Sequence, residues 1–246
     1  MRNIVTRGII ISRRNYKEAD RILIVYTERL GKISVLAKGV RKSTSKLGGH
    51  LELFNISRLE LEEGKNWYIL TGAQTEKNFA KIRLNLPKIS AGFFIAELIS
   101  HLTVENDVNR SFFKVIENGF KILNKSKKEI VANAFVWQLV NQSGYHPELY
   151  NCVICNKKLN SSEIAFSSIK GGLVDNCNVV SDAIAIEPDT VKLIRVATKN
   201  IDIFHQLIIP KKNIKEFNLI TKIYISNIIE REIKSEKFIE IANKLI

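Results

Sequence analysis

The chain has 246 residues, of which 45% are hydrophobic and 26% are charged, a balance typical of a folded protein with a buried core. No stretch approaches the roughly eighteen apolar residues of a membrane span, and the charged start lacks the apolar core of a signal peptide. The net charge of +13 favours a polyanionic partner. We therefore expect a cytoplasmic protein that has no membrane partner.

The positive charge is concentrated at the start of the chain. The first 47 residues hold twelve Lys and Arg against three acids (Glu18, Asp20 and Glu28), which is a net +9 of the chain's +13. Charge gathered in one segment is more informative than a basic composition, because it predicts a localised surface for a polyanion.

Five short strands are predicted in the first 80 residues, joined mostly by tight turns: 3–12, 19–27, 31–38, 51–62 and 67–71. Such closely spaced strands predict a small antiparallel barrel or sandwich. Together with a basic loop they favour an OB-type barrel, although the pattern alone does not separate it from an SH3-like one.

The basic loop follows the third predicted strand and contains four cations and no acid between residues 38 and 46. A strand that leads into a flexible cationic loop can hold a phosphate backbone against a sheet, and the alternative is a solvated lysine-rich loop. Six cations are predicted to contact phosphates: Arg13, Arg14, Lys38, Arg41, Lys42 and Lys46. Tyr16, Tyr26 and Trp67 either stack on bases or belong to the core.

Helical periodicity begins after Gln74. Helices are predicted over 84–102, 109–123, 129–142, 188–198, 214–233 and 238–245, with Pro87 in the first turn of the first and Asp107 or Asn109 capping the second. Residues 146–182 are predicted to be an irregular insertion. The fold class is therefore α+β multidomain, with a barrel at 1–80 and a helical domain at 81–246 that contains this insertion.

Cys152 and Cys155 have the spacing of a zinc knuckle, since two intervening residues let both thiolates reach one ion. Asp175 and Cys177 lie about twenty residues later and complete a candidate structural Zn²⁺ site. The alternatives are a site that has lost its metal and a redox dithiol.

No catalytic arrangement is recognisable in the sequence. Phosphate-binding, dinucleotide-binding and nucleophile-elbow motifs are absent, and the four histidines are isolated. The acids of the predicted sheet, Glu52, Glu60, Glu62 and Glu63, are typical of a solvated face. We expect a protein that is not an enzyme.

Four groups of residues resemble the RecO family of bacterial DNA repair proteins, which are recombination mediators. They are 8–11 with 16–23 and 26–28, then 31–33 with 37–42, then 144–155 with Phe166 and 171–173, and finally 233–238. The resemblance implies an N-terminal OB fold, a helical domain and a zinc-ribbon-like insertion. Asp175 stands about where that family's pattern has a cysteine, and Cys177 is out of register, which puts metal binding in doubt.

The resemblance also implies a function. It implies binding of single- and double-stranded DNA, annealing of complementary strands, and a nucleoid-associated location. Its partners would be RecR and the C-terminal tail of the single-strand-binding protein, with RecA loaded indirectly. Candidate surfaces for that acidic tail are the 211–234 helix and the region around Lys121 to Lys128.

Two alternative functions remain open. One is a protein-interaction adaptor whose DNA affinity is incidental, and the other is an OB-fold RNA-binding protein. The salt dependence of DNA binding separates the adaptor from a mediator. Four to six phosphate contacts on a single strand give a slope of roughly −3 to −4 when the logarithm of the binding constant is plotted against the logarithm of the salt concentration.

Overall fold

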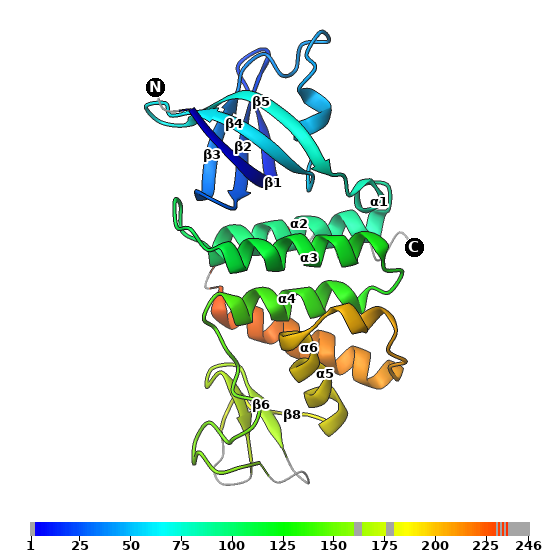
Figure 1. The fold of residues 1–246 in the computed structure, drawn as a ribbon. Coiled ribbons are helices and arrows are strands. Elements are labelled where there is room, and N and C mark those ends of the chain that lie inside the picture. Colours follow the sequence, from blue (N-terminus) through cyan, green and yellow to red (C-terminus); the bar gives the residue numbers. More distant parts are fainter. Residues whose placement is uncertain are drawn as a thin grey trace. The chain divides into compact units, whose positions relative to one another are not determined.

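The computed structural model describes residues 3–159, 164–175 and 180–229 together with Arg231, Ile233 and Ser235 (Figure 1). Packing divides the described chain into two compact units: the first comprises residues up to 125 with Ile233 and Ser235, and the second runs from Ser126 to Arg231. This division differs from the predicted domain boundary at residue 81, because three helices beyond that point pack with the barrel. No described helix is long and apolar enough to cross a membrane.

The first unit begins with a closed five-stranded barrel of order β1-β2-β3-β5-β4. Its strands are β1 (Asn3–Tyr16), β2 (Asp20–Thr27), β3 (Gly31–Ala37), β4 (Ile56–Glu62) and β5 (Tyr68–Lys77). Neighbours are antiparallel except β3 and β5, which are parallel. The predicted OB-type barrel is confirmed.

Strand lengths differ from the prediction in three ways, one of which is that β5 continues beyond the predicted end at residue 71 to Lys77. β1 continues to Tyr16 because the polar residues after Ser12 pair with the start of β2, beyond a register shift between Ile10 and Ser12. The predicted strand 51–62 begins only at Ile56, because Gly48–Leu51 forms a 3₁₀ turn, η1. Polar residues in a hairpin and apolar residues in a turn both weaken the period-2 signal.

The barrel core is built from alternate residues of neighbouring strands. Ile10 pairs with Val25, Val25 with Ile33, and Leu23 with Val35, and all five side chains are buried. Gly8 is required where β1 passes this core, since a Cβ there would lie 2.6 Å from a methyl carbon of Val25.

Three helices complete the first unit: α1 (Ala80–Arg83), α2 (Leu86–Leu102) and α3 (Arg110–Lys125). The Asn85 side chain accepts a hydrogen bond from Lys88 N at the start of α2, and Asn109 accepts one from Phe112 N at the start of α3. These side chains satisfy backbone donors that the first turn leaves unpaired. Asn109 is therefore the cap, rather than Asp107.

Aromatic residues hold α2 and α3 to the barrel. Phe54 stacks on Phe120 of α3 at 5.3 Å between ring centroids and meets Phe93 of α2 edge-on at 5.8 Å. A Cβ at Gly92 would lie 2.9 Å from the Phe54 ring, so glycine is what allows α2 to approach so closely. Phe54 itself has a positive φ of 68°.

The second unit packs α4 (Ile130–Gln142), α5 (Pro188–Lys199) and α6 (Lys211–Ile228) around Trp137. The Trp137 indole donates to Thr221 Oγ1 at 2.8 Å and stacks on Tyr224 at 5.1 Å. A 3₁₀ turn, η2 (Asp202–His205), follows α5. The predicted helix 238–245 lies outside the described residues.

The predicted irregular insertion contains a small sheet. Its strands are β6 (Ala165–Ser167), β7 (Gly172–Val174) and β8 (Ile184–Ala185), in the order β7-β6-β8. Strands of two or three residues are too short to produce a detectable period, which explains why the sequence pattern missed them. The side chain of Asp182 fixes the turn after β6 by accepting from Ser167, Ser168 and Ile169 N.

Candidate nucleic-acid interface

Two connections lie together at one end of the barrel. They are the β1–β2 turn at residues 17–19 and the segment Lys38–Leu47 after β3, which we call the basic loop. Asp20 Oδ1 accepts a hydrogen bond from Gly39 N at 2.7 Å, and Arg41 N donates to Ala19 O at 2.9 Å. The Arg41 guanidinium also donates to Glu18 O at 2.9 Å. The basic loop is therefore anchored along the turn.

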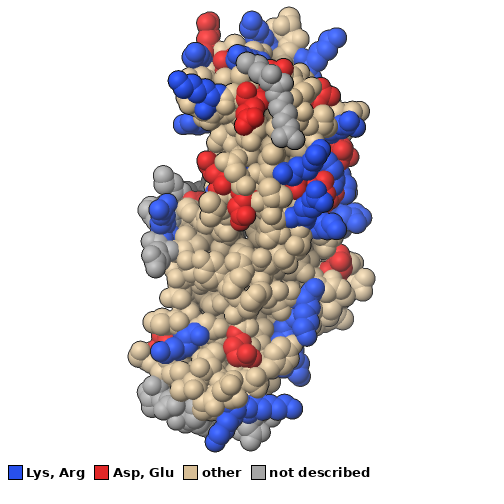
Figure 2. All heavy atoms as spheres, turned by 60° about the vertical axis from the view of Figure 1, so that its left-hand side comes forward, with Lys and Arg blue, Asp and Glu red and all other residues tan. Residues whose placement is uncertain are grey.

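The structure brings five of the six predicted phosphate-binding cations to this end as exposed side chains: Arg14, Lys38, Arg41, Lys42 and Lys46. Arg14 of β1 lies opposite Ile22 of β2 in the sheet, and Ile22 lies opposite Leu36 of β3, near the start of the basic loop. Their contacts with phosphate remain a prediction. In Figure 2 the barrel forms the upper part of the view, and Lys and Arg side chains project from it beside several Asp and Glu.

Arg13 differs from the other five. Its Nη1 donates to Glu52 Oε1 at 2.7 Å, and its side chain is only 28% exposed. A guanidinium with a carboxylate partner has less charge to offer a phosphate than the cations of the basic loop, for which the described residues show no ion pair.

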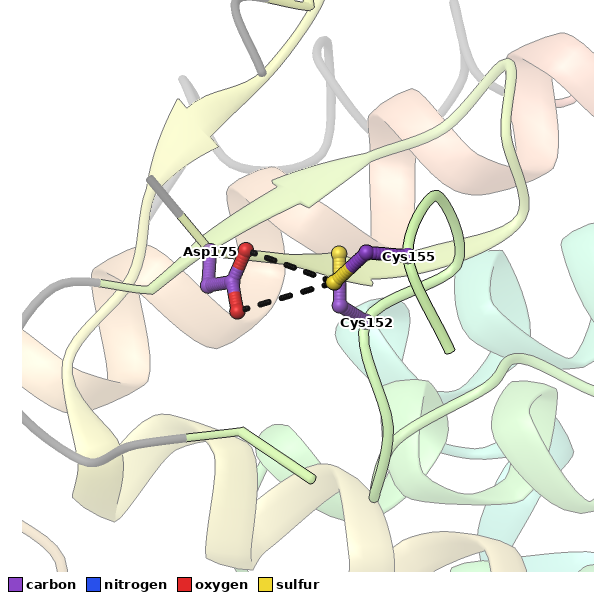
Figure 3. Close-up of side chains that lie close together, drawn as sticks. All are labelled: Cys152, Cys155 and Asp175. Atoms are coloured by element: carbon purple, nitrogen blue, oxygen red, sulfur yellow. Dashed lines mark hydrogen bonds between the residues drawn. The ribbon is translucent and has the colours of Figure 1, made fainter. Parts of the chain in front are cut away.

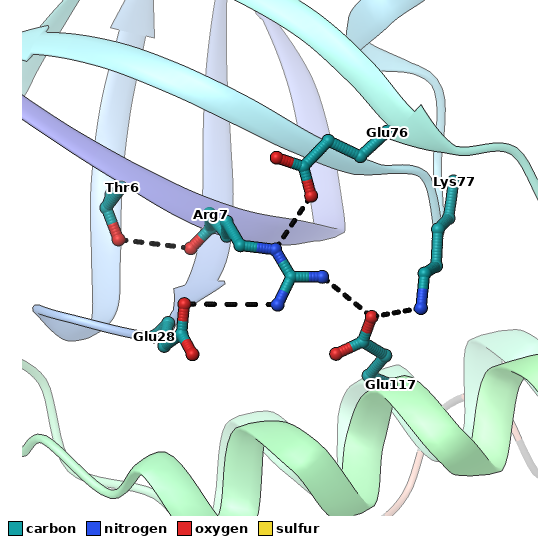
Figure 4. Close-up of polar contacts among 6 residues, drawn as sticks. All are labelled: Thr6, Arg7, Glu28, Glu76, Lys77 and Glu117. Atoms are coloured by element: carbon teal, nitrogen blue, oxygen red, sulfur yellow. Dashed lines mark hydrogen bonds and ion pairs between the residues drawn. The ribbon is translucent and has the colours of Figure 1, made fainter.

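Other cations of the basic N-terminal segment are used inside the protein. Arg7 donates to Glu76 and Glu117 at 2.7 Å each and lies 3.9 Å from Glu28 (Figure 4). Lys77 also contacts Glu117. The net charge of +9 counted over the first 47 residues is therefore larger than the positive charge that this segment can offer to a polyanion.

The Lys32 side chain is likewise used inside the protein. Its ammonium group donates to the carbonyl oxygens of Ser100 at 2.6 Å and Thr103 at 2.5 Å, at the end of α2. Burial lowers the pKa of Lys32, and the nearby charge of Glu105 partly opposes that shift. A cation is favoured at a helix C-terminus because it meets carbonyls that have no partner within the helix.

Two aromatic side chains lie beside the same end of the barrel. Tyr16 and Trp67 meet edge-on at 5.3 Å between ring centroids, and both are half-buried. Tyr26 is 1% exposed and packs on Phe112, so it belongs to the core. Of the three predicted aromatic residues, Tyr16 and Trp67 therefore stay candidates for stacking on bases, and Tyr26 does not.

Sequence reasoning missed one cation of this surface. Lys17 is exposed in the β1–β2 turn with φ of 50°, and its Nζ lies 5.6 Å from the centroid of the Tyr16 ring. Its place directly after Tyr16 and three residues after Arg14 was the available signal, since cations beside aromatic rings are typical of single-strand-binding surfaces.

The predicted metal ligands gather in the second unit. Ligand atoms of Cys152, Cys155 and Asp175 all lie within 4.8 Å of one another, and Cys155 Sγ is 4.0 Å from each carboxylate oxygen (Figure 3). Cys177 lies outside the described residues. Zinc with Zn–S of about 2.3 Å and Zn–O of about 2.1 Å holds such donors roughly 4 Å apart, and a structural zinc site has four of them. The three residues are therefore close to the spacing of a zinc site and supply three of its four ligands.

The backbone around Cys152 supports a compact knuckle. Asn156 N donates to Cys152 O at 2.9 Å, and Asn156 has φ of 59°, a conformation that asparagine tolerates. Val153 N donates to Leu173 O, which joins the knuckle to β7. This junction brings Asp175, one residue beyond β7, toward the two cysteines.

Comparison with known proteins gives a consistent result over most of the chain. A family model described as "Recombination protein O N terminal" matches residues 1–79, and one described as "Recombination protein O C terminal" matches residues 83–237. The chain is 35% identical to the "DNA repair protein RecO" of Dehalococcoides mccartyi over 94% of this chain and 92% of the relative. It is 30% identical to that of Roseiflexus sp. over 98% and 86%, respectively.

Proposed function

The chain belongs to the recombination protein O (RecO) family, and we propose that it is a mediator of DNA repair and homologous recombination. It binds single- and double-stranded DNA, anneals complementary strands, and helps to load RecA onto DNA coated by single-strand-binding protein. RecR and the tail of the single-strand-binding protein are its proposed partners. The exposed cations on α6 and the region from Lys121 to Lys128 both remain candidates for that tail.

The observation that carries this proposal is the combination of exposed cations and two half-buried aromatic rings at one end of the barrel. The basic loop, Arg14 and Lys17 offer positive charge for phosphates, and Tyr16 and Trp67 offer rings for bases. OB-type barrels use this combination to bind single strands without sequence preference.

Annealing requires no covalent chemistry, and we propose that the protein is not an enzyme. Two strands repel each other through their phosphates, and a protein that neutralises part of that charge lets complementary bases meet. The contribution of the basic loop is therefore electrostatic, and we expect it to weaken as salt rises.

The test is annealing of two complementary DNA strands, bare or coated with the cognate single-strand-binding protein. Binding to one strand is followed through Trp67 fluorescence, since the second tryptophan, Trp137, is buried and in the second unit. We expect annealing together with a log–log salt slope of roughly −3 to −4. A nearly flat slope without annealing would favour the adaptor, and a marked preference for RNA would favour the RNA-binding protein.

We further propose that Cys152, Cys155 and Asp175 hold a structural Zn²⁺, with Cys177, which lies outside the described residues, as the predicted fourth ligand. The ion would cross-link the knuckle to the end of β7. We expect native mass spectrometry of the wild type to show one zinc per chain and Cys155→Ala to show none. A chelator should lower the melting temperature of the wild type and leave that of Cys155→Ala unchanged.

The half-exposed Cys155 is a better choice for this test than the buried Cys152, whose replacement disturbs packing in any case. Ile154→Ala, at the neighbouring exposed position, is the matched control and should keep its zinc. A wild-type protein that carries no zinc and does not respond to chelation would contradict the proposal.

A further inference from the structure

An acid lies in the middle of the cationic barrel end, where it should repel DNA. Asp20, the first residue of β2, is half-buried, and its Oδ1 accepts the 2.7 Å hydrogen bond from Gly39 N. Hydrogen bonds to a carboxylate are about twice as strong as those between neutral groups. The acid thus has a use that offsets its repulsion.

That hydrogen bond fixes the first turn of the basic loop. Gly39 has φ of +62°, which turns the chain away from β3. Its carbonyl then accepts from Lys42 N at 3.1 Å, and Lys42 O accepts from Ser45 N at 2.9 Å. Each contact depends on the one before it, so the orientation of Gly39 sets the directions of Arg41 and Lys42.

A second contact ties the same turn to the β1–β2 hairpin. Arg41 N donates to Ala19 O, next to Asp20 in the sequence. The two contacts place the basic loop beside the hairpin that carries Arg14 and Lys17. A phosphate backbone can meet both groups of cations only while this spacing is kept.

We infer that Asp20 is a positioning residue for DNA binding, which holds the basic loop in register with the cations of the β1–β2 hairpin. This inference rests on the proposed function. Asp20 does not touch DNA itself. Its carboxylate raises affinity through the loop, although its charge alone would lower affinity.

Two substitutions separate these effects. Asp20→Ala and Asp20→Asn remove the same negative charge, but the asparagine side chain keeps an oxygen that can accept from Gly39 N. We expect Asp20→Ala to weaken binding of a single-stranded oligonucleotide about fivefold or more, as the loss of a charged hydrogen bond implies. We also expect its salt slope to become shallower by about 0.7 for each phosphate contact that is lost.

Asp20→Asn should bind as tightly as the wild type or more tightly. Glu18→Ala is the matched control, because Glu18 is an exposed acid in the same turn and contributes its backbone carbonyl to Arg41. It should bind slightly more tightly. Amide hydrogen exchange over residues 39–45 should accelerate in Asp20→Ala and in neither of the other two variants. If Asp20→Ala does not fold, Asp20→Ser replaces it, because the serine hydroxyl is a weaker acceptor than the carboxylate.

Equal affinities of Asp20→Ala and Asp20→Asn, with a functional wild type, would overturn the positioning role and leave the proposed function intact. A wild type that does not bind DNA would overturn both. Tighter binding by Asp20→Ala would show that the carboxylate acts by repulsion alone.

Discussion

Reversing two charges of the basic loop, in the double variant Arg41→Glu with Lys42→Glu, is expected to weaken binding to single-stranded DNA about a hundredfold or more. Both side chains are exposed, so each loses an attraction and gains a repulsion, and the one described contact that is lost is the exposed hydrogen bond from the Arg41 guanidinium to Glu18 O. Each such change contributes about 1 kcal/mol near a phosphate in water, and the changes accumulate. Fluorescence titration at fixed salt measures the loss, and annealing should fall with it.

Reversing two exposed lysines of α6, Lys211→Glu with Lys215→Glu, provides the matched control, since it changes the net charge equally. An acid at position 211, the first residue of α6, is favourable to the helix, and position 215 is exposed, so the fold of this control should be kept. We expect it to keep most of the affinity for bare DNA. Equal losses in both variants would mean that affinity depends on net charge alone, which would favour the adaptor. Full affinity in both would place the DNA path elsewhere.

The sequence was sufficient to predict the barrel and its basic loop because both depend on local patterns. β2 is a short run of β-branched and aromatic residues, β3 largely alternates, and a loop without acids after a strand is visible from neighbouring residues. The strand ends were wrong where polar residues continue a hairpin, as between Ser12 and Tyr16.

The cations with internal partners could not be recognised from the sequence. Arg7, Arg13 and Lys32 look the same in the sequence as the cations of the basic loop. Their partners are distant along the chain: Glu117 lies 110 residues from Arg7, and the carbonyl of Ser100 lies 68 residues from Lys32. Ion pairs of this kind follow from tertiary packing and leave no local signal.

Three of the four predicted metal ligands lie together in the structure. Local spacing identified Cys152 and Cys155, the sequence offered Asp175 about twenty residues later, and the pairing of the knuckle with β7 is what brings Asp175 near the cysteines. The position of Cys177, outside the described residues, leaves its part in the set a prediction.

Removal of Arg7 is expected to have the largest effect on stability. Glu117, 15% exposed, would keep only Lys77 as its cationic partner in Arg7→Met. A partly buried carboxylate that loses its main partner costs about 2–3 kcal/mol. Urea unfolding at pH 7 should show this loss, whereas Arg14→Met, at an exposed cation of the same strand, should change stability by about 0.5 kcal/mol or less.

The pH dependence identifies the cause of that loss. Burial raises the pKa of the Glu117 carboxyl, but hydrogen bonds from Arg7 and Lys77 outweigh burial and hold that pKa below its usual range. A carboxylate with a lowered pKa stabilises the fold above its unfolded pKa of about 4.3, and this contribution disappears as pH falls through the folded pKa. The difference in unfolding free energy between wild type and Arg7→Met should therefore be largest near neutral pH and shrink once pH falls below about 4.

The guanidinium of Arg7 also lies 5.4 Å from the centroid of the Phe113 ring, so packing is the competing explanation. Packing of an alkyl chain and a cation on that ring does not depend on the protonation of Glu117. A difference that stays constant from pH 7 to pH 3 would thus assign the effect to Phe113. Glu117→Gln should remove the pH-dependent part even in the presence of Arg7, which tests the ion pair from its other side.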